Sequence, residues 1–142
     1  MKTTSNMMLR VAAVLALGTG FALAQSEINN LKATIPFDFK VGNTTLPAGV
    51  YTVEMRPGSP VVAIQDVDKK VRATILAISA AAKPGDNDRS KLVFNVDGSN
   101  HYLASTWNAT SGMGKQLPKT AAEREAEVAG VPSTVTIYIA QR

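Results

Sequence analysis

The sequence predicts an all-β fold, mainly antiparallel, built as a barrel or a sandwich of about seven strands with one short late helix. Three observations predict it. Apolar and polar residues alternate in short runs, which is the period of a strand. Clusters of Gly, Pro, Asn and Asp separate these runs at intervals of roughly 8–12 residues, which is typical of sandwiches and barrels. Helical patterning is confined to an apolar N-terminal stretch and one segment near the C-terminus.

The N-terminal stretch has the three parts of a secretory signal. Residues 1–10 carry Lys2 and Arg10 and no acid, and an uncharged apolar run follows to Ala24. The run ends in Ala22-Leu23-Ala24, an A-x-A cleavage site, so we expect a signal helix over residues 1–24 and a mature chain that starts at Gln25. The run is shorter than the ~20 apolar residues that span a bilayer. The sequence therefore predicts export by the secretory route, without a stable membrane span after cleavage. It does not distinguish a periplasmic from an extracellular destination.

Size and composition predict one self-sufficient domain. Removing residues 1–24 from the 142-residue chain leaves residues 25–142, enough for a single β-rich domain with a core of its own. The chain has no cysteine, which excludes disulfides, thiol catalysis and a lipid-modified cysteine. Loss of Lys2 and Arg10 lowers the formal net charge from +4 to +2. No basic cluster with interleaved aromatics occurs, so nucleic acid is not an expected partner.

The mature chain contains seven runs with strand patterning. Pro36 interrupts the first run and indicates a sheet edge or a bulge, because proline has no N–H to donate. Asp97-Gly98 lies between two of the runs and predicts a hairpin. A second hairpin is expected around residues 66–70. The expected strands are residues 31–41, 50–55, 61–65, 71–79, 91–96, 101–107 and 134–140.

One mature segment is predicted to be helical, over residues 121–129. Thr120 and Glu123 form the T-x-x-E pattern of a capping box. Good helix formers follow, and Gly130 and Pro132 stand where a helix ends. The apolar positions of this segment are few and small. We therefore expect a light cover on the sheet or a solvated arm.

The candidate catalytic residues have simpler structural interpretations. His101 is the only histidine and opens a strand, and a general base also needs an orienting partner. Asp66, Asp68, Asp86, Asp88 and Asp97 lie in turns, where aspartate is favoured for turn chemistry. Neither the Asp-x-Asp pairs nor the lone histidine completes a calcium or zinc pattern. The sequence predicts no catalytic, cofactor-binding or metal-ligating residue, although it leaves the roles of Asp86, Asp88, Asp97 and His101 open.

Three further motifs are interpreted as structural. Asn43-Thr44-Thr45 and Asn108-Ala109-Thr110 match the N-glycosylation pattern and are expected in loops. Residues 111–115 place two glycines near a lysine, but the spacing is wrong for a phosphate-binding loop, so a flexible loop is expected. Five of the aromatic residues are expected in the core, with a sugar-stacking face as the alternative. They are Tyr51, Phe94, Tyr102, Trp107 and Tyr138.

Three motifs carry a resemblance to a protein family. Residues 35–42 (IPFDFKVG) and 46–53 (LPAGVYTV), together with residues 112–119 (GMGKQLPK), resemble a signature of small secreted proteins that are abundant in Acidobacteria. The resemblance covers most of the mature chain and implies an exported β domain. It supplies no catalytic residues to carry over. Val50 departs from the family pattern, which often has an acid before the tyrosine.

Two classes of function follow from these observations. The first is a non-enzymatic envelope or extracellular module that binds a surface, a glycan or a partner protein, and we favour it because no catalytic constellation is present. The second is a small hydrolase or lyase that uses loop acids, which predicts Asp86, Asp88 or Asp97 in a concave pocket. A carrier of a small apolar ligand is a further alternative, if the sheet closes around a cavity.

Overall fold

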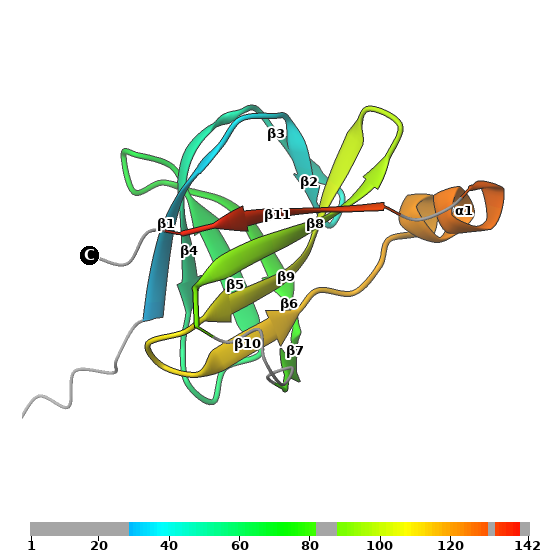
Figure 1. Ribbon diagram of the computed structural model, residues 1–142. Helices are drawn as coiled ribbons and strands as arrows, with labels where there is room; N and C mark the ends of the chain where they lie inside the picture. Colours follow the sequence, from blue (N-terminus) through cyan, green and yellow to red (C-terminus); the bar gives the residue numbers. More distant parts are fainter. Residues whose placement is uncertain (1–28, 82–87, 131–132, 140–142) are drawn as a thin grey trace, which may run out of the picture.

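The computed structural model describes residues 29–81, 88–130 and 133–139, and these residues form two β-sheets packed as a sandwich rather than a closed barrel (Figure 1). The expected all-β, mainly antiparallel fold is confirmed. Ala22, Ala24 and Gln25 of the expected cleavage site lie outside the described residues, and so does Asp86. In the part of the chain that is described, no helix has the length and apolar character needed to cross a membrane.

The smaller sheet has four antiparallel strands in the order β1-β4-β5-β6. They are β1 (Asn29–Ile35), β4 (Gly49–Met55), β5 (Val61–Gln65) and β6 (Val71–Leu76). Their apolar residues alternate with polar ones, so every second side chain faces the other sheet. In β1 these inward residues are Leu31, Ala33 and Ile35, which are all buried.

The larger sheet follows the order β11-β8-β9-β10-β7, and β2 and β3 branch from β9. Its only parallel contact among the described strands joins Lys40 of β2 to Tyr102 of β9. The strands are β2 (Phe39–Val41), β3 (Thr44–Leu46), β7 (Ile78–Ala80), β8 (Lys91–Asp97), β9 (Asn100–Asn108), β10 (Met113–Gln116) and β11 (Ser133–Tyr138).

The core between the sheets centres on aromatic contacts. The ring of Phe39 meets those of Tyr51 and Phe94 edge to face, with centroids 5.2 Å and 5.7 Å apart. Phe37 packs edge-on against Phe94 as well. Tyr51, Phe94, Tyr102 and Trp107 are buried as expected. Tyr138 is not a core residue: it is 47% exposed, because it faces outward from β11.

The described residues contain eleven strands rather than about seven, partly because two expected strands divide where the chain changes sheets. Residues 31–41 break at Pro36 into β1 of the smaller sheet and β2 of the larger. Proline cannot continue the ladder, so the chain crosses over at this position. Residues 71–79 break at Ala77, whose N–H donates to the carbonyl of Pro60 at 2.7 Å. β1 is an edge strand, as Pro36 indicated.

Two strands lie in segments that the sequence assigned to turns and loops. Thr44–Leu46 is β3, although Asn43-Thr44-Thr45 reads as a loop. The prediction of a flexible loop at residues 111–115 is wrong for residues 113–115, because Met113–Gln116 is the strand β10. β10 pairs with both β9 and β7. Its glycine and its lysine fit a strand only because of contacts with distant residues.

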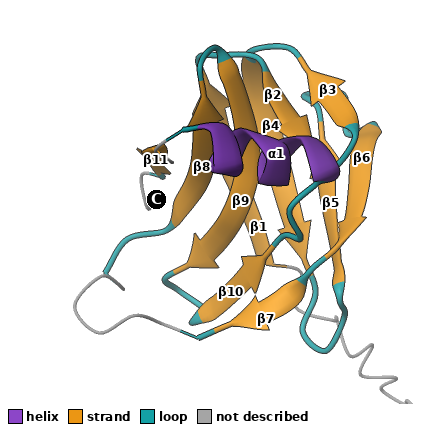
Figure 2. Ribbon diagram, turned by 90° about the vertical axis from the view of Figure 1, so that its right-hand side faces the viewer, coloured by secondary structure: helices purple, strands orange, loops and turns teal. Residues whose placement is uncertain are grey.

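The helix α1 (Ala121–Ala129) forms where the sequence predicts it, and its capping box is complete. Glu123 N donates to Thr120 Oγ1 at 3.2 Å, and Thr120 N donates to Glu123 Oε2 at 2.9 Å. Figure 2 shows α1 lying across the outer face of the larger sheet. Only Glu123 is buried, while Val128 is 91% exposed, so α1 is the light cover that was expected.

Replacing Thr120 with alanine should destabilise α1 by about 1 kcal/mol, because the hydroxyl acceptor of the capping box is lost. Amide hydrogen exchange of residues 121–125 should then accelerate, while exchange in the β8–β9 hairpin stays unchanged. Thr74→Ala on the outer face of β6 is the matched control. Unaltered exchange in the first turn of α1 would contradict this role of the cap.

Candidate functional site

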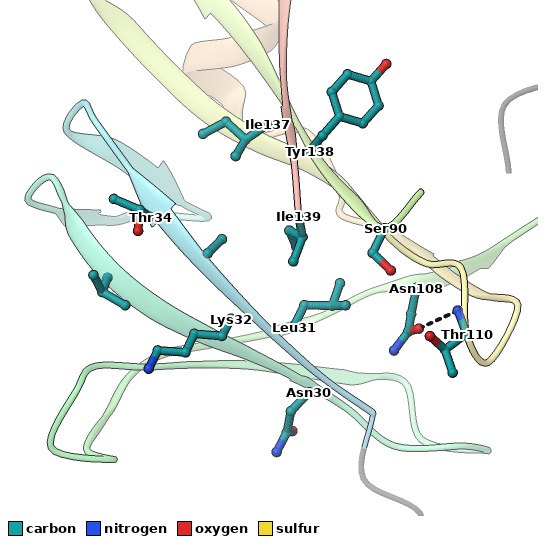
Figure 3. Close-up of a pocket in the computed structure, with 12 residues that line it drawn as sticks. Asn30, Leu31, Lys32, Thr34, Ser90, Asn108, Thr110, Ile137, Tyr138 and Ile139 are labelled. Atoms are coloured by element: carbon teal, nitrogen blue, oxygen red, sulfur yellow. Dashed lines mark hydrogen bonds between the residues drawn. The ribbon is translucent and has the colours of Figure 1, made fainter. Parts of the chain in front are cut away.

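A cleft of about 600 Å³ opens between the two sheets at their β1 and β11 edges (Figure 3). Leu31 and Ile139 point toward each other across it, whereas Lys32 points outward from β1. Its volume lies within the range of small-ligand sites, ~300–1,000 Å³. The cleft is lined by Asn30, Leu31, Lys32, Ala33, Thr34, Val50, Ser90, Asn108, Thr110, Ile137, Tyr138 and Ile139.

The cleft runs along two unpaired strand edges. Within the described residues, β1 pairs only with β4, and β11 pairs only with β8. Five consecutive β1 residues, 30–34, line the cleft, and so do residues 137–139. Successive side chains of a strand face opposite ways, so a run of consecutive residues borders a cleft only where the backbone edge itself faces it. Both walls therefore present backbone N–H and C=O groups.

The floor of the cleft is apolar and continuous with the core. Leu31 and Ala33 are buried at its β1 side. Ile137 and Ile139 are partly buried and pack against the core from the β11 side. Ile139 N donates to Ser90 O at 2.8 Å, which extends the β11–β8 ladder by one residue. These side chains leave an apolar trough between the sheets.

A group of polar residues closes one end of the cleft. Ser90 and Asn108 are buried, and Ser90 Oγ accepts from Ala109 N at 2.9 Å. Asn108 Oδ1 accepts from Thr110 N at 3.0 Å and from Ser111 N at 3.3 Å. Asn108 is therefore a buried residue at the end of β9 rather than the loop residue expected of a glycosylation pattern. Figure 3 shows the amide nitrogen of Asn108 pointing toward the Asn30 end of β1, where it can donate to a ligand.

A second hollow, of about 580 Å³, lies on the outer face of the larger sheet. In this hollow, Lys91 of β8 lies between its cross-strand neighbours, Tyr138 of β11 and Trp107 of β9. Trp107 is buried, however, and the Arg89 guanidinium covers the Tyr138 ring at 4.2 Å. Lys119 is already ion-paired with Glu127. The aromatic and cationic groups of this face are therefore largely engaged within the protein, which disfavours a sugar-stacking role.

The described candidate acids do not meet in a common site. Asp66 and Asp68 lie in the β5–β6 turn, whereas Asp97 lies at the far end of β8. Asp97 borders only a hollow of about 30 Å³ beside α1. Asp88 is exposed ahead of β8. Among the described residues, no three His, Asp or Glu side chains are grouped so as to hold a metal ion.

Asp66 has the turn role expected of it. Its Oδ1 accepts from Asp68 N at 2.9 Å and from Lys70 N at 3.0 Å, and its Oδ2 accepts from Arg72 Nε at 2.6 Å. Desolvation of the carboxyl works to raise its pKa. The hydrogen bonds from Lys70 and Arg72, together with the Arg72 charge, outweigh this effect and lower the pKa of Asp66 below its ordinary value.

Asp66 should accordingly titrate below its ordinary pKa of about 3.9. Since the folded-state pKa is lowered, its stabilising effect is present above the ordinary pKa and is lost as the pH falls through the folded value. Arg72→Gln should move the midpoint upward. Carbon-detected NMR of the side-chain carboxyl measures both midpoints, and an unchanged midpoint in the variant would contradict the assigned cause.

His101 lies in β9, as the sequence indicates, and its ring stacks on Phe37 with centroids 3.9 Å apart. Its Nδ1 is the one buried side-chain nitrogen or oxygen without a hydrogen-bond partner in the described part of the chain. No hydroxyl nucleophile or orienting carboxylate is hydrogen-bonded to it there. The geometry around His101 therefore provides packing rather than a catalytic dyad.

Comparison of the chain with protein-family models, with curated proteins and with solved structures finds no match. Of the cleft residues, the sequence singled out Asn108 and Thr110 only as part of a glycosylation pattern and Tyr138 only as an aromatic residue. Its only signals were Pro36, which indicated an edge for the first strand, and the alternation of Leu31, Ala33, Ile137 and Ile139.

Proposed function

We propose that this chain is an exported, non-enzymatic binding module whose ligand lies in the cleft between β1 and β11. The observation that carries the proposal is that two strand edges, neither paired with any other described strand, open onto one apolar trough. Exposed edges are normally short, covered or interrupted, because they bind other chains. An edge of seven residues beside an open trough therefore favours a recognition surface.

The arrangement of polar groups in the cleft supports binding rather than catalysis. Ser90 and Asn108 are held by backbone hydrogen bonds of the β9–β10 turn, and the lining has no carboxylate or histidine among the described residues. General acid–base or nucleophilic chemistry needs such a group within hydrogen-bond reach of the substrate. Asn108 offers a neutral donor, which suits orientation of a ligand.

The proposed setting is outside the cytoplasm. The basic start, the apolar run and the A-x-A motif at Ala22–Ala24 favour export by the secretory route, with a mature chain from Gln25. The module would then act in the periplasm or outside the cell. Partners in these compartments include envelope proteins and glycans, and the cleft favours the protein class.

NMR titration of the mature chain tests the proposal. The probes are a short extended peptide, dodecanoate and cellohexaose, which represent peptide, lipid and glycan chemistry. We expect at least one probe to shift amide resonances of residues 30–34 and 137–139. Ile139→Asp, which places a charge in the apolar trough, should abolish these shifts, whereas Thr74→Ala on β6 should not. Shifts that cluster elsewhere, or no response to any probe, would overturn the proposal.

A further inference from the structure

We infer that the ligand of this cleft is an extended polypeptide segment that adds as a strand to the free edge of β1 and carries an acidic residue opposite Lys32. The inference rests on the proposed binding function and names its ligand class. Strand addition is a recurring mode of peptide recognition, in which main-chain hydrogen bonds give affinity and alternate side chains give specificity.

The backbone of β1 indicates a strand as the ligand. In an antiparallel pair, alternate residues direct their N–H and C=O groups toward the partner strand, and the residues between them direct theirs away. β1 pairs with β4 through all seven of its residues, Asn29 to Ile35, without a bulge. Every second residue therefore presents both backbone groups to the cleft, at the spacing that an added strand matches. A lipid chain would leave these groups without a partner.

The cleft also fits the side chains of such a strand. Alternate side chains of the added segment would enter the trough between Leu31 and Ala33 on one side and Ile137 and Ile139 on the other. We expect these side chains to be apolar, because the four side chains that they would meet are hydrocarbon. At the end of the trough, the amide nitrogen of Asn108 is placed to donate to a peptide carbonyl.

The charge at the rim of the cleft indicates which side chains the added strand should carry on its outward face. Lys32 is the one charged residue among those described as lining the cleft, and it is exposed at the middle of the 30–34 edge. Its neighbour on β4 is Thr52, and the next acid on that strand, Glu54, is bonded to Arg56 and Gln65. No acid of the sheet therefore stands opposite Lys32. An opposite charge directly across an antiparallel pair is stabilising, and a like charge is destabilising.

A charge-swap titration tests the inference. The probes are acetyl-Thr-Val-Glu-Val-Thr-amide and the same peptide with lysine in place of glutamate. The wild-type chain should bind the glutamate peptide about three- to tenfold more tightly than the lysine peptide, as expected for one cross-strand ion pair. Lys32→Glu should reverse this preference, and Lys32→Gln should abolish it. Lys70→Glu makes the same change of charge in the distant β5–β6 turn and should leave the preference intact.

The outcomes separate this inference from the proposed function. Equal affinity of the wild-type chain for both peptides, or an unchanged preference in Lys32→Glu, would overturn the pairing at Lys32. Binding of dodecanoate or cellohexaose in the cleft without peptide binding would overturn the peptide ligand and leave the binding function standing. Concentration-dependent self-association of Lys32→Gln without peptide binding would show that Lys32 only guards the edge. No response in the cleft to any probe would refute both proposals.

Discussion

Replacing Lys115 with alanine should lower the free energy of unfolding by about 3 kcal/mol, because a buried side-chain stem is lost and the partly buried Ser59 carbonyl loses its donor. Lys115 is only 4% exposed, although it lies in the short strand β10. Its Nζ donates to the carbonyl of Ser59 at 2.9 Å and to Ser79 Oγ at 3.3 Å. Ser59 belongs to the β4–β5 turn of the smaller sheet, whereas Ser79 belongs to β7 of the larger. The lysine thus joins the two sheets at one end of the sandwich.

Lys115→Met separates the two contributions to this stability. The methionine keeps most of the hydrocarbon stem but leaves the Ser59 carbonyl without its donor, so we expect a loss of about 1–2 kcal/mol. Urea unfolding measures both variants, and Lys119→Ala, at an exposed ion pair, is the control, with an expected change below about 1 kcal/mol. If Lys115→Ala were as stable as the wild-type chain, Lys115 would have no role in joining the sheets.

Replacing Gly114 with alanine should destabilise the fold by about 2 kcal/mol through overpacking. A Cβ at this position would lie 2.8 Å from Cε3 of Trp107 and 3.1 Å from the carbonyl oxygen of Ala80. The first contact is with a buried indole and the second with backbone, so neither neighbour moves without disturbing the β9–β10–β7 pairing. Gly114 is needed because Trp107 occupies the space that a side chain would fill.

Gly130→Ala is the matched control for this substitution. Gly130 ends α1 in an extended conformation, with a φ of −158°, and an added Cβ would meet nothing within 4 Å. Its effect should stay within about 0.5 kcal/mol. Trp107 is the only tryptophan, so intrinsic fluorescence reports on its surroundings alone. Unchanged fluorescence and stability in Gly114→Ala would show that the indole does not depend on this glycine.

The elements that the sequence predicts correctly depend on local signals. The β8–β9 hairpin follows from Asp97-Gly98, where Gly98 adopts a φ of +57°. The helix follows from the capping box at Thr120. The elements that it misses depend on distant contacts. β10 contains a glycine and a lysine, which are depleted in strands. The glycine makes room for Trp107 of β9, and the lysine reaches Ser59 in the β4–β5 turn. At Pro36 and Ala77 the chain passes from one sheet to the other. The alternation of apolar and polar residues does not reveal such a crossing.

The sequence does not predict the candidate site, for a similar reason. Alternation identifies Leu31 and Ile137 as inward residues, but it does not say which strands end as edges or which edges face each other. β1 and β11 come from opposite ends of the described chain, and no motif joins them. Among the residues that the sequence singles out, Asp66 has a turn role and His101 packs against Phe37. The cleft forms because the order of the strands leaves β1 and β11 as edges of the two sheets.

Amide hydrogen exchange on the mature chain, with and without the glutamate peptide, tests the central claim most directly. Strand addition predicts that alternate residues within 30–34, those whose N–H groups face away from β4, exchange quickly alone and become protected when the peptide is bound. Residues 72–76 of β6, the opposite edge of the same sheet, serve as the internal control and should not change. Protection absent from β1, or equal at β1 and β6, would contradict a binding edge at the β1–β11 cleft.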